Sequence, residues 1–116
     1  MVLMDVPVLD FESVLARLDG DKQLFAEISG MLLEDAPRLL ADLRTAVVEH
    51  DSKSVRAHAH ALKGLLTNCG GMRAARIAQS LEDAGNSQQL DGAAAMLESL
   101  DEEMAVLSKV LRNYGA

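Results

Sequence analysis

The chain has few of the residues that favour β-strands or that cross-link a fold. Its 116 residues include two Phe, one Tyr, no Trp, two Pro and a single Cys. Because strands favour aromatic and β-branched residues, this composition, which is rich in Leu and Ala, indicates an all-α domain. Cys69 cannot form a disulfide within the chain, which fits a reducing compartment.

Long apolar runs and N-terminal basic residues are also missing. No run approaches the roughly 18 apolar residues that a membrane-spanning helix needs. The opening MVLMDVPVL lacks the basic region of a signal peptide. The sequence therefore predicts a cytoplasmic domain without membrane insertion, and its net charge of −7 argues against nucleic-acid binding.

Acidic residues are absent from one long stretch, Ser52 to Leu81, although the chain as a whole is acidic. That stretch has a charge of +5, and the remaining residues together carry −12. Its five basic residues are Lys53, Arg56, Lys63, Arg73 and Arg76. A solvated surface of mixed charge would be the ordinary expectation, so this segregation predicts that an anionic partner surface docks here.

The spacing of apolar residues and of helix-capping residues predicts five helices. The first is a short helix over FESVLARL, capped by Asp10 and ended by Asp19-Gly20-Asp21, which also caps the next helix. The second is a long helix from Lys22 to about His50, which Pro37 should kink or split. The last three are Asp51 to Gly70-Gly71, Arg73 to Ala84 closed by Gly85, and a fifth capped by Asn86 or Ser87.

The last predicted helix carries a seven-residue repeat. Its apolar positions are Leu90, Leu97, Met104 and Leu111, with Ala93, Leu100 and Leu107 between them. Such a seam is typical of a left-handed helix bundle. Short connections between long helices favour antiparallel neighbours, so we expect an up-down antiparallel four-helix bundle with a short extra N-terminal helix. The bundle domain is predicted to span residues 10–113, after a tail of residues 1–9.

The helix that follows Asp51 presents His60 to solvent. If Leu62 marks the centre of the apolar face, then Val55, Ala59, Leu66 and Cys69 lie within about 60° of it, whereas His60 lies at about 160°. The same outer half carries Lys53, Arg56, Lys63, Gly64 and Thr67. An exposed histidine among cations is therefore predicted.

Two neighbours give His60 a chemical role. Lys63 lies at i+3, where its ammonium can neutralise a phosphoryl group on the imidazole. Gly64 lies at i+4, and an exposed glycine there costs a helix about 1 kcal/mol against alanine. The missing side chain would let another protein approach the imidazole closely. Neutral imidazole is a suitable nucleophile towards an acyl phosphate.

The other two histidines have simpler interpretations. His50 lies at a helix C-terminus, where a cation is favoured, and His58 faces the core stripe as a packed, hydrogen-bonded residue. Residues two apart on a helix point about 200° apart, so His58 and His60 cannot share a metal ion. No metal site is predicted.

The segment AHALKGLLTNCGG resembles the signature of the histidine-containing phosphotransfer (HPt) family, H-x-L-K-G followed by a glycine six residues later. His60, Leu62, Lys63, Gly64 and Gly70 match it position by position. The resemblance implies a four-helix bundle in which His60 accepts a phosphoryl group from a receiver-domain aspartate and passes it to another. Such a domain is a carrier that neither binds ATP nor phosphorylates itself.

The resemblance also implies roles for further residues. Glu82 matches a position that often orients the histidine through Nδ1, with Gln79 and Thr67 at the edge of the site. The docking surface for receivers would comprise Lys53, Arg56, Lys63, Arg73 and Arg76. No cofactor is expected on this chain, because the receiver supplies Mg²⁺, and a monomer is expected.

Three alternatives to this interpretation remain open at the level of sequence. The phosphoacceptor domain of a chemotaxis-type kinase shares the signature, in which case a kinase domain is the donor. The dimerisation helix of a sensor kinase fits less well, because Ala61 follows His60 where that family has an acid. A helical adaptor without chemistry would also use the basic segment.

Overall fold

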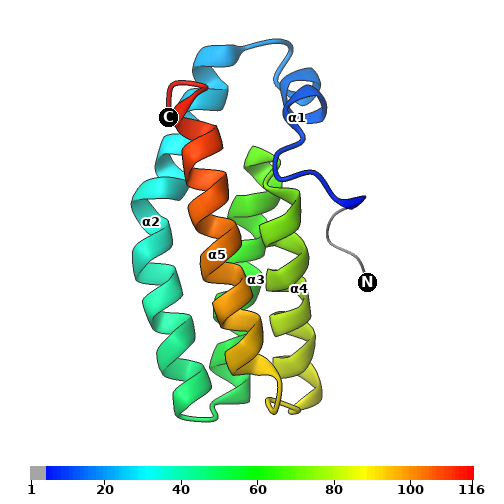
Figure 1. The fold of residues 1–116 in the computed structure, drawn as a ribbon, viewed down its shortest axis with the longest axis vertical. Coiled ribbons are helices and arrows are strands. Elements are labelled where there is room, and N and C mark those ends of the chain that lie inside the picture. Colours follow the sequence, from blue (N-terminus) through cyan, green and yellow to red (C-terminus); the bar gives the residue numbers. More distant parts are fainter. Residues whose placement is uncertain (1–4) are drawn as a thin grey trace.

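The computed structural model describes residues 5–116, which form five helices. They are α1 (Phe11–Arg17), α2 (Lys22–Val48), α3 (Ser52–Cys69), α4 (Met72–Ser87) and α5 (Ala93–Arg112). Helices α2 to α5 run side by side, each antiparallel to the next, and α1 lies at the end where α3 stops and α4 starts (Figure 1). The predicted all-α, up-down four-helix bundle with an extra N-terminal helix is confirmed. None of the helices described in residues 5–116 is both long and apolar enough to cross a membrane.

Aspartates begin the first three helices as predicted. The carboxylates of Asp10, Asp21 and Asp51 accept hydrogen bonds from the backbone N–H groups of Ser13, Leu24 and Ser54, respectively. Each bond satisfies one of the amides that a helix N-terminus leaves without an intrahelical partner. At the other end of α3, Gly70 adopts φ +83° and terminates the helix, also as predicted.

Proline does not divide α2, which continues unbroken from Lys22 to Val48. Of the two predicted outcomes at Pro37, a kink or a split, the split is therefore wrong. Pro37 removes one intrahelical hydrogen bond, but its neighbours Ala36 and Leu39 are both buried in the core. Burial of these flanking side chains holds the helix together across the proline.

The end of α4 and the start of α5 also differ from prediction. Gly85 lies inside α4, which ends at Ser87 with Gln88, at φ +59°, as its C-cap. Helix α5 begins after Gly92 rather than at Asn86 or Ser87. A Cβ on Gly85 would lie 2.6 Å from the backbone N of Arg56 and 2.7 Å from the carbonyl oxygen of Ser52. This glycine is therefore a point of close approach between α4 and α3, not a helix terminator.

The core lies along the predicted faces of the helices. Its largest fully buried side chains include Leu43 of α2, Leu62 and Leu66 of α3, Leu81 of α4 and Leu100 of α5. Six of the seven residues of the predicted α5 seam are buried; the seventh, Leu90, precedes the helix and is half-buried.

The described part of the predicted tail lies against the bundle. Val6 is buried, and its carbonyl accepts a hydrogen bond from Arg73 Nε. The Asp10 N–H donates to the carbonyl of Gly70 at 2.8 Å, which fastens the start of α1 to the turn between α3 and α4. All three aromatic residues meet at this end of the molecule, because Phe11 lies with ring centroids 5.0 Å from Phe25 and 4.3 Å from Tyr114.

Candidate functional site

Helix α3 places His60 on the outer surface of the bundle. Its apolar face, Val55, Ala59, Leu62, Leu66 and Cys69, is completely buried. The His60 side chain, on the opposite side, is 67% exposed. The helical-wheel prediction for this residue is therefore confirmed.

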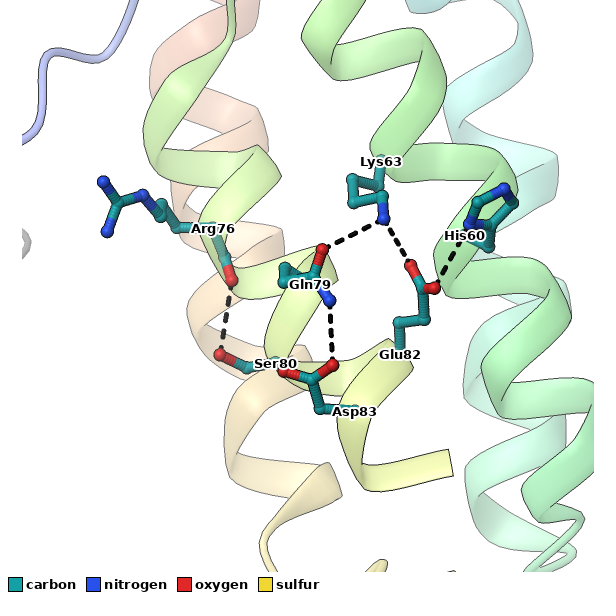
Figure 2. A network of polar contacts seen from close by, with 7 residues as sticks. All are labelled: His60, Lys63, Arg76, Gln79, Ser80, Glu82 and Asp83. Carbon is teal, nitrogen blue, oxygen red and sulfur yellow. Dashed lines mark hydrogen bonds and ion pairs between the residues drawn. The ribbon is translucent and has the colours of Figure 1, made fainter. Parts of the chain in front are cut away.

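Glu82 of α4 contacts the inner edge of the His60 imidazole. Its Oε2 lies 3.2 Å from Nδ1, and the other ring nitrogen, Nε2, points away from α4 (Figure 2). The hydrogen bond from Lys63, and to a smaller degree that from His60, lowers the pKa of Glu82, although burial opposes the shift. An ionised Glu82 can only accept a hydrogen bond, so it favours the imidazole tautomer with hydrogen on Nδ1 and a lone pair on Nε2.

Lys63 is bound to the same carboxylate. Its Nζ lies 2.8 Å from Glu82 Oε1 and donates to Gln79 Oε1 at 3.0 Å. The Lys63 side chain is only 25% exposed. The structure thus brings together four residues that the sequence singled out, two from α3 and two from α4 (Figure 2).

A fifth member of this network, Asp83, was missed at the level of sequence. The Gln79 amide nitrogen donates to Asp83 Oδ1 at 2.8 Å. The two residues are one turn apart on α4, which is the spacing at which helical side chains meet. That spacing was the available signal, but it has meaning only once Gln79 is known to contact Lys63.

The outer surface of α3 forms a continuous exposed stripe. Its members recur every three or four residues and are Lys53, Arg56, His60, Gly64 and Thr67. A Cβ added to Gly64 would meet nothing within 4 Å, so the space beside His60 is open. The exposed stripe therefore offers a second protein access to the imidazole.

Helix α1 adds a cation at one end of the exposed stripe. Arg17 Nη2 donates to the carbonyl oxygen of Thr67 at 3.2 Å. Arg17 also lines an apolar hollow of about 230 Å³ between α1, α2 and α3, beside Leu65 and the exposed Met31. Arg17 and Thr67 are 50 residues apart, so no local sequence pattern could have paired them.

The side chains of two predicted docking residues of α4 do not face His60. Arg73 faces the N-terminal segment, where it donates to the Val6 carbonyl, and its Nη1 lies 3.9 Å from Glu103 of α5. Arg76 is exposed on α4, and its side chain extends away from His60 (Figure 2). The basic residues of the acid-free stretch are therefore divided between different surfaces.

The other histidines lie apart from His60. His58 is half-buried at the edge of the α2–α3 interface, where it lines a hollow with Asp42, Glu49 and Asp51. His50 is exposed just after α2, with φ +53°. Within residues 5–116, no group of three or more His, Cys, Asp or Glu side chains is arranged to hold a metal ion.

Comparison with known proteins agrees with this geometry. The structure resembles histidine-containing phosphotransfer protein B (HptB) from Pseudomonas aeruginosa PAO1, with a TM-score of 0.85 and 22% identity over 93% of this chain and 94% of that one. It also resembles the histidine-containing phosphotransfer protein MtHPt2 from Medicago truncatula, with a TM-score of 0.78 and 24% identity over 97% of this chain and 80% of that one. At these identities the likeness shows the fold.

The family is shown by the sequence. No curated protein matches the chain, but the family model described as the Hpt domain matches residues 27–110, well over half of its length. This match includes the exposed histidine of α3 and its partners on α4. The chain belongs to the Hpt domain family.

Proposed function

We propose that this domain carries a phosphoryl group on His60 between the aspartates of response-regulator receiver domains. The observation that carries the proposal is the state of the imidazole. Its Nδ1 is bound to Glu82, while Nε2 points away from α4 on a ring that is 67% exposed (Figure 2). Hpt domains are phosphoryl carriers, and this arrangement supplies a nucleophile without the apparatus of an enzyme.

The proposed transfer is a direct displacement at phosphorus. The Nε2 lone pair attacks the phosphoryl group of a receiver aspartate, the Nε2–P bond forms, the P–O bond breaks, and the aspartate leaves as a carboxylate. In the second transfer a receiver carboxylate attacks and His60 leaves. Glu82 keeps the proton on Nδ1 in both directions, so the ring needs no tautomer change.

The surroundings of His60 suit the approach of a receiver. Gly64 leaves room beside the imidazole, and Lys53, Arg56 and Thr67 line the approach on the exposed stripe. The basic charges would attract the acidic pocket of a receiver. Arg76 is proposed at the edge of this surface, whereas Arg73 is assigned to holding the N-terminal segment. The apolar hollow beside Leu65 would extend the contact.

The remaining chemistry is proposed to come from the partner. We expect the receiver to supply Mg²⁺ and most of the stabilisation of the phosphoryl charge, so this domain needs no cofactor. Lys63 adds one cation from this side. We further propose that residues 10–113 fold as a monomeric unit that forms a modest, transient interface in the cytoplasm.

Phosphoryl uptake from a radiolabelled phospho-receiver with Mg²⁺ tests the proposal. The wild type and His58→Gln should both become labelled, and the label should be acid-labile and base-stable. His60→Gln should take up none. His58 is the matched control, because it lies two residues away on the same helix and faces α2.

Other outcomes would change the assignment. Label that follows His58 would contradict the role of His60. Label from an ATP-loaded histidine kinase domain, with none from a panel of receivers, would assign the domain to a chemotaxis-type kinase. No label from any donor, with partner binding unchanged in His60→Gln, would assign it to a helical adaptor.

A further inference from the structure

Lys63 lies against α4 rather than beside the reactive edge of His60. Its ammonium is within 3.0 Å of two acceptors, Glu82 Oε1 and Gln79 Oε1. The Nε2 edge of the imidazole faces the other way (Figure 2). An ammonium that is to contact a phosphoryl group on Nε2 must therefore leave at least one of its acceptors on α4.

The contact with Asp83 determines which end of the Gln79 side-chain amide faces Lys63. The amide NH₂ donates to Asp83 Oδ1, so the amide oxygen faces Lys63. With the amide turned over, its NH₂ would face the ammonium and its oxygen would face the carboxylate, and both contacts would be lost. The Asp83 carboxylate therefore makes Gln79 an acceptor for Lys63.

We propose that Gln79 and Asp83 are positioning residues that hold the Lys63 ammonium on α4 in the unphosphorylated domain. They thereby set how readily Lys63 moves to the phosphoryl group, an inference that rests on phosphorylation of His60 as proposed above. Two acceptor sets compete for one cation: the oxygens on α4 and the oxygens of the phosphoryl group. Weakening the contacts of the Lys63 ammonium with the oxygens on α4 therefore favours its contact with the phosphoryl oxygens.

This competition for the Lys63 ammonium should affect how fast the phosphohistidine is hydrolysed. In hydrolysis, water attacks phosphorus, the P–Nε2 bond breaks, and the imidazole leaves with the electron pair on Nε2 and its proton still on Nδ1. The protons of the water end on inorganic phosphate or in solvent. The transition state is loose, so negative charge on the phosphoryl oxygens falls as the bond breaks. An ammonium on those oxygens stabilises the ground state more than the transition state. Releasing Lys63 from α4 should therefore slow hydrolysis.

The hold on Lys63 can be measured without phosphorylation. In competitive acetylation with acetic anhydride, Lys63 should react more slowly than the exposed Lys53 on the same helix, which serves as an internal reference. Gln79→Met should raise the Lys63 to Lys53 ratio about threefold, the effect of losing one hydrogen bond. Asp83→Asn should raise it less. A ratio in Gln79→Met equal to that of the wild type would overturn the inference.

Matched controls lie just beyond α4. Gln89→Met and Asp91→Asn make the same chemical changes at exposed positions between α4 and α5, and both should leave the ratio unchanged. A rise in either control as large as that in Gln79→Met would show a general effect on reactivity and would overturn the inference.

The second measurement concerns the phosphorylated domain. Phosphoramidate phosphorylates the imidazole directly: Nε2 attacks phosphorus, the P–N bond of the reagent breaks, and ammonia leaves. Hydrolysis is then followed by ³¹P NMR. It should be about threefold slower in Gln79→Met than in the wild type, and slowed less in Asp83→Asn. A rate in Gln79→Met equal to that of the wild type would overturn the inference.

A double-mutant cycle isolates the role of Lys63. In a Lys63→Met background, the Gln79 and Asp83 variants should have no further effect on hydrolysis. An effect that persists there would overturn the inference. A domain that phosphoramidate labels but receivers do not would contradict only the proposed donor, and the Gln79 comparison would still decide this inference. A wild type that phosphoramidate does not label would contradict both.

Discussion

Two glycines lie in the interiors of α3 and α4, and their surroundings are opposite. A Cβ on Gly85 would lie within 3.0 Å of three backbone atoms of α3, whereas a Cβ on Gly64 would meet nothing within 4 Å. Each glycine costs its helix about 1 kcal/mol relative to alanine. Contacts within the domain offset that cost at Gly85. At Gly64 no contact within the described chain does so, which supports the proposed approach of a second protein.

The comparison separates the two faces of the α3–α4 pair. Gly85 lets the helix backbones approach, and this close packing holds α4 where Glu82 and Gln79 can reach α3. Gly64 leaves space on the outer face, beside His60. The same residue type therefore serves the fold on one face and, under the proposed function, access to the site on the other.

The largest expected effect on stability comes from adding a side chain at Gly85, which faces α3. Gly85→Ala should destabilise the domain by about 3 kcal/mol, because the atoms that its Cβ would meet belong to backbone and cannot move independently. Urea denaturation followed by circular dichroism measures the loss. Asn86→Ala, at the next, exposed position of α4, is the control and should stay within about 0.5 kcal/mol of the wild type. A loss below about 1 kcal/mol at Gly85 would contradict the close approach.

The next largest effect is expected from adding a side chain at Gly64, on the outer face of α3. Gly64→Ala should raise the free energy of unfolding by about 1 kcal/mol, because alanine is the better helix former and has open space. The same variant should slow phosphoryl transfer from a receiver about tenfold or more, because a small displacement of reacting atoms is costly. Stopped-flow or quench measurements of transfer, together with thermal denaturation, test both halves.

Gly30 of α2 provides the control for Gly64. Its added Cβ would also meet nothing within 4 Å, and it shares a helix face with Leu33 and Pro37, which lie against α5. Gly30→Ala should therefore stabilise the fold to a similar degree and leave transfer unchanged. Equal slowing in the two alanine variants would remove the argument that Gly64 serves access.

Local signals predicted most of this fold. The three capping aspartates, the glycine that ends α3 and the buried seam of α5 all follow from residue preference and periodicity. The exposure of His60 follows in the same way, from the position of the apolar stripe on one helix. Each of these features depends on residues within one or two turns.

Tertiary contacts account for what the sequence did not reveal. Gly85 looked like a helix terminator because the sequence alone does not distinguish a glycine that ends a helix from one that lets two helices approach closely. The pairing of Lys63 with Gln79, and hence the role of Asp83, requires knowing how α4 is rotated against α3. Arg73 looked like part of a docking surface, yet it contacts Val6, 67 residues away in the chain.

The contact between the two helices at the site should contribute a smaller, pH-dependent stability. The bonds from Lys63 and His60 lower the pKa of Glu82 from its ordinary value of 4.5. A lowered folded pKa stabilises the folded state above about pH 4.5, and this contribution is lost as the pH falls through the folded value. Glu82→Gln should therefore be less stable than the wild type at neutral pH, by at most about 1 kcal/mol.

Denaturation at neutral pH and at about pH 3 tests this linkage. The difference between Glu82→Gln and the wild type should shrink in acid, because protonated Glu82 no longer binds Lys63 as an ion pair. Asp83→Asn is the useful comparison, since Asp83 accepts a hydrogen bond from the neutral amide of Gln79 rather than from a cation. A stability difference in Glu82→Gln that is the same at both pH values would contradict the ionic origin of the contact.

The smallest effect on stability is expected on the exposed stripe, where charge should act on association alone. Lys53→Ala and Arg56→Ala should each leave the free energy of unfolding within about 0.5 kcal/mol of the wild type. Each should slow association with a phospho-receiver a few-fold at low salt, and the difference should fade as salt rises, because exposed charges are screened. Lys109→Ala removes the same charge from the exposed surface of α5 and is the control. If it slowed association as much, net charge rather than the exposed stripe would steer the receiver, and Gly64 would be left as the main support for docking at this face.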